Sequence, residues 1–160
     1  MMVAAWMIEA KTIANGLRLA SGCLADARTL VQSGSRNAAY LAEQCLEQIV
    51  RSLATSEGLH IERHDAHQLD KVVRRFPDDH PEKEALNGLV WLEAYATTFC
   101  YTSPSGQIPK TPSVERLNQA LDALAQLQER VVAHFGVELN SDGSPAKSVP
   151  PMRKWNAGRT

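Results

Sequence analysis

The sequence predicts an all-α protein, an up-and-down bundle of four long helices plus one short helix. In several long segments, apolar residues recur at alternating steps of three and four, which is the pattern of a helix with one buried face. Glycines, prolines and N-capping residues separate these segments, and no segment has the clear alternation of a half-buried strand. Of the 160 residues, 44% are hydrophobic. A single domain of this length and composition can bury a stable core without disulfides or a structural metal.

The first two long helices are expected to form a hairpin. Apolar residues of the segment 13–31 make one stripe, and Gly34 supplies a C-terminal break after it. Ser35 then has the character of an N-cap for a second helix, whose apolar positions span 38–53 and which Gly58 ends. The second stripe is wide enough to face several neighbours. We therefore expect the second helix to be central and its apolar face to contribute to a dimer.

A short helix and a fourth long segment follow. Asp65 and Gln68 have the spacing of a capping box, which would begin a short third helix that Pro77 ends. Pro81, followed by acidic residues, marks the next helix start, because proline suits the first turn and carboxylates suit the positive end of the helix dipole. This fourth helix is expected to run to about Tyr101.

The last helix is predicted to have Thr111 as its N-cap and Pro112 as its first residue. Near-heptad apolar spacing carries it to Phe135, and its end is expected to extend past the bundle. After Gly136 the periodicity is lost and prolines are frequent. The sequence therefore predicts a helical domain over residues 1–136 and an irregular C-terminal tail over 137–160.

Charge and cysteine content limit the function. Seventeen Lys and Arg against eighteen Asp and Glu give a net charge of -1, which argues against a general polyanion binder. The residues before Glu9 are too few to span a membrane and carry no charged leader region, so neither membrane association nor export is expected. The odd number of cysteines, all in apolar helical patterns, predicts reduced thiols and a cytoplasmic location. These cysteines are Cys23, Cys45 and Cys100.

A polar cluster lies between the second and third predicted helices. Its imidazoles, three and four residues apart, are of a type that zinc accepts. However, they fall in a connection and not on one helix face, so we interpret the cluster as a polar connector, with Asp65 as a cap and His67 against the second helix. No metal site is expected. No glycine-rich phosphate loop is present, so no cofactor is expected either. The cluster consists of His60, Glu62, His64, Asp65 and His67.

The segment 35–109 resembles the HEPN family, the higher eukaryote and prokaryote nucleotide-binding domain. The resemblance rests on three stretches in matching order: NAAYLAEQCLEQIVRSLATSEG in the second helix, HQLDKVV from His67, and YATTFCYTSPSGQIP at the end of the fourth. HEPN proteins are helical bundles that commonly dimerise, and they bind nucleotides, act as ribonuclease toxins or partner small nucleotidyltransferases. Many carry Arg-Tyr-Pro where this chain has Cys100, Tyr101 and Thr102. The basic residue is therefore missing here.

Ribonuclease members of the family carry an arginine, four to six residues, and a histidine, paired across a dimer. Here only Arg75 or Arg74 with His80 has this spacing. In such a pair the histidine transfers protons and the arginine neutralises the phosphorane. Because Pro77 lies between the two in a connection between helices, we expect a binding module and not a competent ribonuclease. RNA cleavage by Arg75 and His80 stays the alternative.

Under the binding hypothesis, a nucleotide, an RNA or a partner protein would bind near the loop that precedes the last helix. Tyr95 and Tyr101 could stack on a base. Ser103, Ser105 and Lys110 could meet a phosphate beside the helix N-terminus. All five also fit ordinary packing or an ordinary loop. The resemblance implies a homodimer and, in a toxin-antitoxin role, a nucleotidyltransferase partner; a purely structural dimer is the third possibility.

Overall fold

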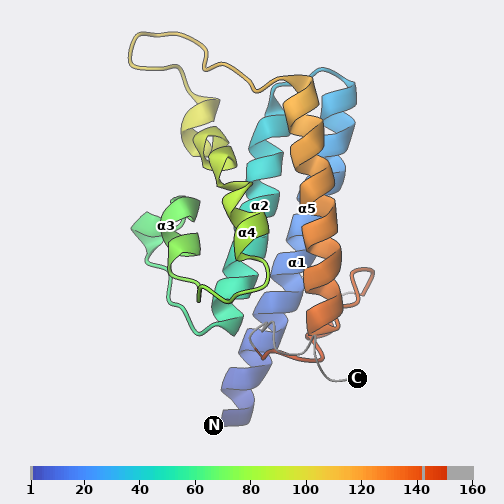
Figure 1. Ribbon diagram of the computed structural model, residues 1–160. Coiled ribbons are helices and arrows are strands. Elements are labelled where there is room, and N and C mark those ends of the chain that lie inside the picture. The colour runs from blue at the N-terminus through green and yellow to red at the C-terminus, as the bar shows by residue number, and fades with distance from the viewer. Residues whose placement is uncertain (1, 142, 151–160) are drawn as a thin grey trace.

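The computed structural model describes residues 2–141 and 143–150, with only the backbone of residues 2–4. Three long helices lie side by side, and a series of short helices packs against the opposite side of the second one (Figure 1). The predicted all-α fold is confirmed for the described residues. The long helices are α1 (Met2–Gln32), α2 (Asn37–Ser56) and α5 (Val114–Phe135). The short ones are η1 (Arg63–Asp65), α3 (Leu69–Arg74), α4 (Lys83–Asn87), η2 (Val90–Tyr95) and η3 (Thr97–Cys100), where η denotes a 3-10 helix.

The turn between α1 and α2 forms where the sequence predicted it. Gly34 has a φ of 73°, a left-handed conformation that glycine adopts without strain. The N–H of Ser35 donates to the carbonyl of Leu30 at 2.9 Å and closes the end of α1. The Ser35 hydroxyl accepts from the N–H of Asn37 at 3.3 Å, but the N-cap position itself falls on Arg36. The break at Gly34 is confirmed, whereas the assignment of Ser35 as N-cap is one residue early.

Helix α2 is central, as predicted. It contacts α1 and α5 on one side and α3, η2 and η3 on the other. At the crossing with α1, a Cβ on Gly16 would lie 2.5 Å from the hydroxyl of Ser52, so a larger residue at this position would require the Ser52 side chain to move. Leu46, Ile49 and Leu53 are completely buried. Neighbours within the chain therefore cover the apolar stripe of α2, and the expectation that this stripe contributes to a dimer is not supported.

The predicted fourth long helix is broken into α4, η2 and η3. Gly88 ends α4, and from there backbone hydrogen bonds join residues three apart, for example Leu92 N to Leu89 O at 3.0 Å. Extended backbone at Ala96 separates η2 from η3. Gly88 and the β-branched Thr97 are weak helix formers. Helix propensity therefore does not favour one continuous helix over this segment. The predicted bundle of four long helices is wrong in this detail.

The predicted capping box at α3 is absent. Gln68 occupies the N-cap position and its side chain makes no cap hydrogen bond. The Asp65 carboxylate instead accepts from Lys71 Nζ at 2.8 Å. The cap comes from a distant element, because Glu93 of η2 accepts from the N–H of Asp70 at 3.0 Å. A tertiary contact has therefore replaced the local capping interaction.

Helix α5 begins two residues later than predicted. Ser113 is the N-cap: its backbone is extended and its hydroxyl accepts from the N–H of Arg116 at 3.1 Å. The predicted cap, Thr111, lies in the preceding loop. Both residues are hydroxyl N-cap types near a proline, and only backbone geometry distinguishes them.

The first part of the predicted tail is packed against the bundle. Although 137–150 has no regular helix, the N–H of Ala146 donates to Ala10 O at 3.0 Å, and Arg18 donates to two carbonyls of this segment at 2.9 and 2.8 Å. Phe135 is completely buried beneath it. Helix α5 ends at Phe135 with Gly136 as its left-handed C-cap, and the irregular segment that follows covers this end. The expectation of an α5 end extending past the bundle is therefore wrong. The rest of the predicted tail lies outside the described residues.

The three cysteines have different surroundings, and all three thiols are free of disulfides. Cys45 is buried, and burial raises the pKa of its thiol to about 12. Cys23 is half-buried. Cys100, also expected in an apolar pattern, is exposed at the end of η3, so that expectation is wrong. Separately, no helix of the described residues combines the length and apolar character needed to cross a bilayer.

Candidate functional site

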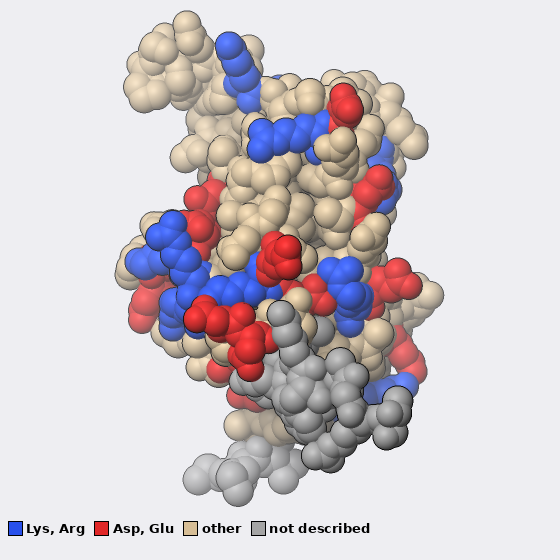
Figure 2. All heavy atoms as spheres, viewed as in Figure 1, with Lys and Arg blue, Asp and Glu red and all other residues tan. Residues whose placement is uncertain are grey.

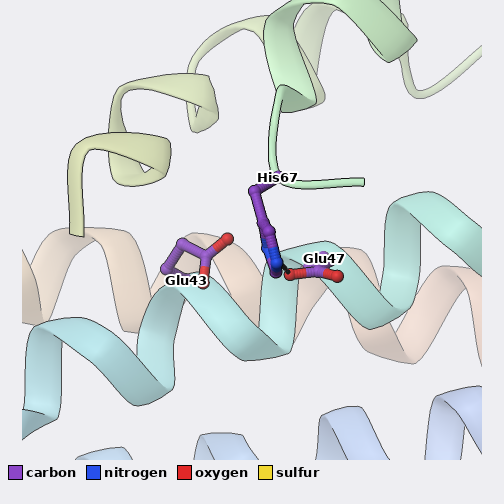
Figure 3. A group of neighbouring side chains, drawn as sticks. All are labelled: Glu43, Glu47 and His67. Atoms are coloured by element: carbon purple, nitrogen blue, oxygen red, sulfur yellow. Dashed lines mark hydrogen bonds and ion pairs between the residues drawn. The ribbon is translucent and has the colours of Figure 1, made fainter. Parts of the chain in front are cut away.

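Two carboxylates and an imidazole meet on the face of α2 that the short helices cover. Glu43 and Glu47 lie one helical turn apart, and His67 reaches them from the connection before α3 (Figure 3). The Nδ1 atom of His67 is 3.0 Å from Glu47 Oε2, and one potential ligand atom from each residue lies within 4.8 Å of the other two. Glu43 is 0% and Glu47 3% exposed, whereas the His67 side chain is 53% exposed. The site is therefore closed on the α2 side and open beside the imidazole.

The two carboxylates have unequal partners. Glu47 Oε1 forms an ion pair with Arg51 at 2.9 Å. Glu43 Oε2 accepts a hydrogen bond from Gln44 Nε2 at 2.8 Å. Glu43 Oε1 is buried and has no hydrogen-bond partner among the described residues. The charge of Glu47 is therefore balanced by the Arg51 guanidinium, whereas Glu43 is hydrogen bonded to the neutral amide of Gln44.

This environment changes the acidity of Glu43. Burial, which is the largest cause, and the nearby charges of Glu47 and Glu93 together raise the pKa of its carboxyl to about 7. The Gln44 hydrogen bond and the charge of Arg51 act in the opposite direction. Near neutral pH the carboxyl therefore exchanges readily between its protonated and ionised forms. Such a group can hold a proton or a cation, and a perturbed carboxyl of this kind is a candidate functional residue.

The polar connector places only one of its histidines at this site. His60 and His64 are 82% and 75% exposed at the side chain and lie 3.5 Å from Glu62 and Asp65, respectively. His67 contacts α2 through Glu47, which confirms the prediction that it lies against the second helix. The two glutamates were not predicted as site residues. Their signal was the pair of carboxylates four residues apart inside a stripe otherwise assigned to the core.

The predicted catalytic pair is not brought together within the chain. The His80 side chain is 0% exposed: its Nδ1 accepts from the N–H of Glu82 at 3.1 Å, and its ring stacks on Phe76 at 5.2 Å. The imidazole also lies 3.6 Å from a Glu57 carboxylate oxygen. Arg75 donates instead to the carbonyl of His60 at 2.7 Å. Both side chains therefore have structural partners.

The predicted ligand-binding residues lie in three situations. Tyr95 is half-buried and packs edge-on between two other aromatic rings, at centroid distances of 5.9 and 5.2 Å. The hydroxyls of Ser103 and Ser105 lie 2.9 Å apart in a hydrogen bond that stabilises their turn. Tyr101 is 67% exposed and Lys110 is also exposed. Tyr101, Ser105 and Lys110 are therefore exposed, whereas Tyr95 and Ser103 are half-buried.

A hollow of about 300 Å³ lies beside this loop, between the α1–α2 turn and the start of α5. Arg36 lies along it, donates to the carbonyl of Pro109 at 2.9 Å and sits 4.0 Å from the centre of the Phe99 ring. Ile108 and Val114 line the hollow and are 73% and 60% exposed. Its rim is therefore mainly apolar, with one guanidinium already bonded to the loop.

The surface charge agrees with the near-zero net charge. On the face seen in Figure 2, basic side chains alternate with acidic ones over the lower half, and the upper part around the loop before α5 carries a few basic side chains and an acidic one among mostly uncharged atoms. Nucleic-acid backbones are usually bound by clustered Lys and Arg. This face carries no such cluster.

No known family model matches the chain, and comparisons with curated proteins and with solved structures find no significant similarity. The resemblance to the HEPN family and the cytoplasmic location therefore stay predictions.

Proposed function

We propose that the chain is a HEPN-like binding module that works as a homodimer, and not a competent ribonuclease. The observation that carries the proposal is the burial of His80. A general acid or base must come within hydrogen-bond reach of the substrate proton, whereas the His80 side chain is 0% exposed, hydrogen bonded through Nδ1 and stacked on Phe76. An RNA substrate would have to open the packing beneath α3 to reach it. Binding without cleavage requires no such opening.

The binding surface of this proposal is the loop before α5 and the hollow beside it. Tyr101, Ile108 and Val114 are the exposed large hydrophobic side chains of this region. Ile108 and Val114 line the hollow, whereas Tyr101 lies at the end of η3 and is not among the lining residues. Exposed apolar side chains beside a hollow are typical of binding sites. Tyr101 would stack on a base or on a partner side chain, and Lys110 would pair with a phosphate or a carboxylate. Ser103 and Ser105 support the turn that presents them.

The dimer of this proposal forms through α1. Ile8 and Leu19 are 65% and 59% exposed and lie about three helical turns apart, hence on one face of the helix. The first turns of α1 also extend past the end of α2 (Figure 1). A second copy of the same helix would cover these two apolar side chains symmetrically, together with the polar Lys11, Thr12 and Asn15 that line the same surface. A toxin-antitoxin role with a nucleotidyltransferase partner is what the HEPN resemblance adds to the proposal.

Sedimentation velocity tests the dimer. We expect a dimer for the wild type and a monomer for Leu19→Glu, because a charge would be placed inside the α1 contact. Ala25→Glu is the matched control: it places the same charge on another exposed part of α1 and should leave the dimer intact. A monomeric wild type at micromolar concentration would contradict this part of the proposal.

An RNA-cleavage assay tests the absence of catalysis. We expect no cleavage of single-stranded RNA by the wild type, and therefore no change with Arg75→Ala or His80→Ala. Circular dichroism would check that the His80 variant is folded, since this residue is buried. Cleavage by the wild type that Arg75→Ala abolishes would establish the ribonuclease alternative in place of the binding module.

A nucleotide titration tests the ligand class. If ATP binds at the loop, Tyr101→Ala should weaken binding roughly tenfold, because base stacking on an aromatic ring contributes about 1–3 kcal/mol. Tyr101→Phe keeps the ring and serves as the control. Absence of ATP binding would exclude the nucleotide and favour a protein partner or a purely structural dimer.

A further inference from the structure

The Glu43 cluster, which consists of Glu43, Glu47 and His67, contains a carboxylate oxygen whose hydrogen-bonding capacity the described residues do not satisfy. A carboxyl group removed from water loses its hydration, and buried polar atoms normally regain a partner inside the fold. Glu43 is 0% exposed, and its Oε1 has no hydrogen-bond partner among the described residues. In Figure 3 its carboxylate is turned toward His67, on the same side of α2 as Glu47. An unsatisfied acceptor beside another carboxylate and an imidazole indicates a missing positive partner.

We propose that Glu43, Glu47 and His67 bind a divalent transition-metal ion of the zinc type. This inference goes beyond the proposed binding function and does not depend on it, because it concerns the opposite side of α2 from the α1 dimer face. The ligand set is one imidazole nitrogen and two carboxylate oxygens, with the exposed side of His67 left for water or a ligand. Zinc accepts both imidazole nitrogen and carboxylate oxygen, and its catalytic sites combine three protein ligands with one open position.

The distances are close to those that the ion requires. Zinc binds imidazole nitrogen and carboxylate oxygen at about 2.0–2.2 Å, so two ligand atoms of a tetrahedral site lie roughly 3.3 Å apart. The Nδ1 of His67 and Oε2 of Glu47 are 3.0 Å apart, and one potential ligand atom from each of the three residues lies within 4.8 Å of the other two. Small side-chain rotations of Glu43 and His67 would bring all three to one ion. The backbone of α2 need not move.

The surrounding bonds leave the right atoms available. Arg51 is paired with Glu47 Oε1, so Oε2 faces His67. Gln44 Nε2 donates to Glu43 Oε2 at 2.8 Å and also to Glu47 Oε2 at 3.5 Å, and it leaves Glu43 Oε1 without a hydrogen-bond partner among the described residues. Outer hydrogen bonds of this kind orient metal ligands and tune their affinity. The imidazole ligand also distinguishes this site from the sites of Mg²⁺ and Ca²⁺, because those ions bind oxygen ligands.

The experiment is a Zn²⁺ titration of the chelator-treated full chain, followed by competition with a chromophoric chelator. We expect one ion per chain, a higher melting temperature with Zn²⁺, and no comparable effect of Mg²⁺. His67→Ala and Glu43→Gln should each weaken Zn²⁺ binding by at least about tenfold, the loss typical even of outer-shell changes. His64→Ala removes an exposed imidazole of the same connector and is the matched control, expected to bind as the wild type does.

Several results would overturn the proposal. One is that the wild type does not bind Zn²⁺ stoichiometrically. Another is that His67→Ala binds Zn²⁺ with wild-type affinity. The third is that His64→Ala loses as much Zn²⁺ affinity as His67→Ala does. In the first case Glu43 holds a proton and not a metal ion. Glu43→Gln preserves side-chain shape, and circular dichroism of the metal-free variants separates loss of a ligand from loss of folding. Metal binding that persists in monomeric Leu19→Glu would show that this site and the dimer are independent.

Discussion

The long helices and the segment of short helices between them are held by different interactions. Helices α1, α2 and α5 have 31, 20 and 22 residues, and their backbone hydrogen bonds lie mainly within each helix. Between Arg63 and Cys100, no element exceeds six residues. There, side chains bond to the backbone of other elements, as Glu93 does to Asp70 N and Lys83 to Phe76 O. The long helices follow from local periodicity, whereas the short segment depends on tertiary contacts.

The Glu43 cluster lies at the boundary between these two regions. Helix α2 supplies two rigid carboxylates, and the irregular connection supplies the imidazole. One strong link from the short segment to the other long helices is also electrostatic: Arg130 of α5 donates two hydrogen bonds of 2.8 Å to the Glu82 carboxylate. The comparison therefore predicts large effects of core substitutions in the long helices and smaller, more localised effects in the short segment.

The largest effect is expected from the core of α2. Leu46→Ala removes a completely buried side chain and should lower the free energy of unfolding by about 2–5 kcal/mol, because lost burial adds to the cost of the cavity. Urea denaturation monitored by circular dichroism measures it. Leu19→Ala, at an exposed position, is the control and should have little effect on the free energy of unfolding in the monomer. A loss below about 1 kcal/mol for Leu46→Ala would mean that α2 is not the centre of the core.

The next largest effect is a pH dependence of the free energy of unfolding that arises from Glu43, at the boundary between the two regions. The pKa of Glu43 is raised from 4.5 to about 7, so between these values the unfolded chain releases a proton that the folded chain retains. Stability from this group is therefore fully present below about pH 4.5 and is lost as pH rises through 7, by roughly 3 kcal/mol in total. The charges of Glu47 and Glu93 increase this loss, whereas the Gln44 hydrogen bond and the charge of Arg51 oppose it.

Glu43→Gln isolates this contribution because it abolishes only the titration of that carboxyl. In the presence of chelator, the free energy of unfolding of the wild type should fall relative to the variant between pH 5 and pH 8. Urea denaturation at both pH values measures the difference, in which titrations shared by the two proteins cancel. A difference that does not change with pH would show that Glu43 is ionised throughout this range.

The smallest effect is expected at the link between α5 and the short segment. Arg130→Gln removes two charge-assisted hydrogen bonds from Glu82, which is 5% exposed. The Arg130 side chain is 47% exposed, so solvent screening limits the loss to about 1–2 kcal/mol. Amide hydrogen exchange should accelerate in the segment 83–100 and much less in α2.

Arg28→Gln is the matched control for this substitution. It breaks the pair with Asp122, whose side chains are 42% and 67% exposed, and such surface pairs contribute about 0–1 kcal/mol. Equal effects of the two substitutions, or uniform acceleration of exchange, would show that Glu82 and Arg130 do not hold the short segment in place.

Periodicity by itself determined the long helices and their order. The stripes of α1, α2 and α5 predicted their existence, the break at Gly34 and the central position of α2, because each depends on residues within a few turns of one another. The interpretation of the residues from His60 to His67 as a polar connector also placed His67 against the second helix. The same reasoning failed from Pro81 to Tyr101, where an apolar pattern compatible with one helix formed three short ones.

Tertiary structure decided everything that depends on residues distant in sequence. The cap of α3 comes from Glu93, the end of α5 is covered by the segment around Ala146, and the His80 imidazole lies 3.6 Å from a carboxylate oxygen of Glu57. The acidity of Glu43 likewise arises from burial, which the spacing of residues along α2 does not specify. Local sequence fixes a helix because its hydrogen bonds join residues four apart, whereas caps, burial and pKa depend on which surfaces meet.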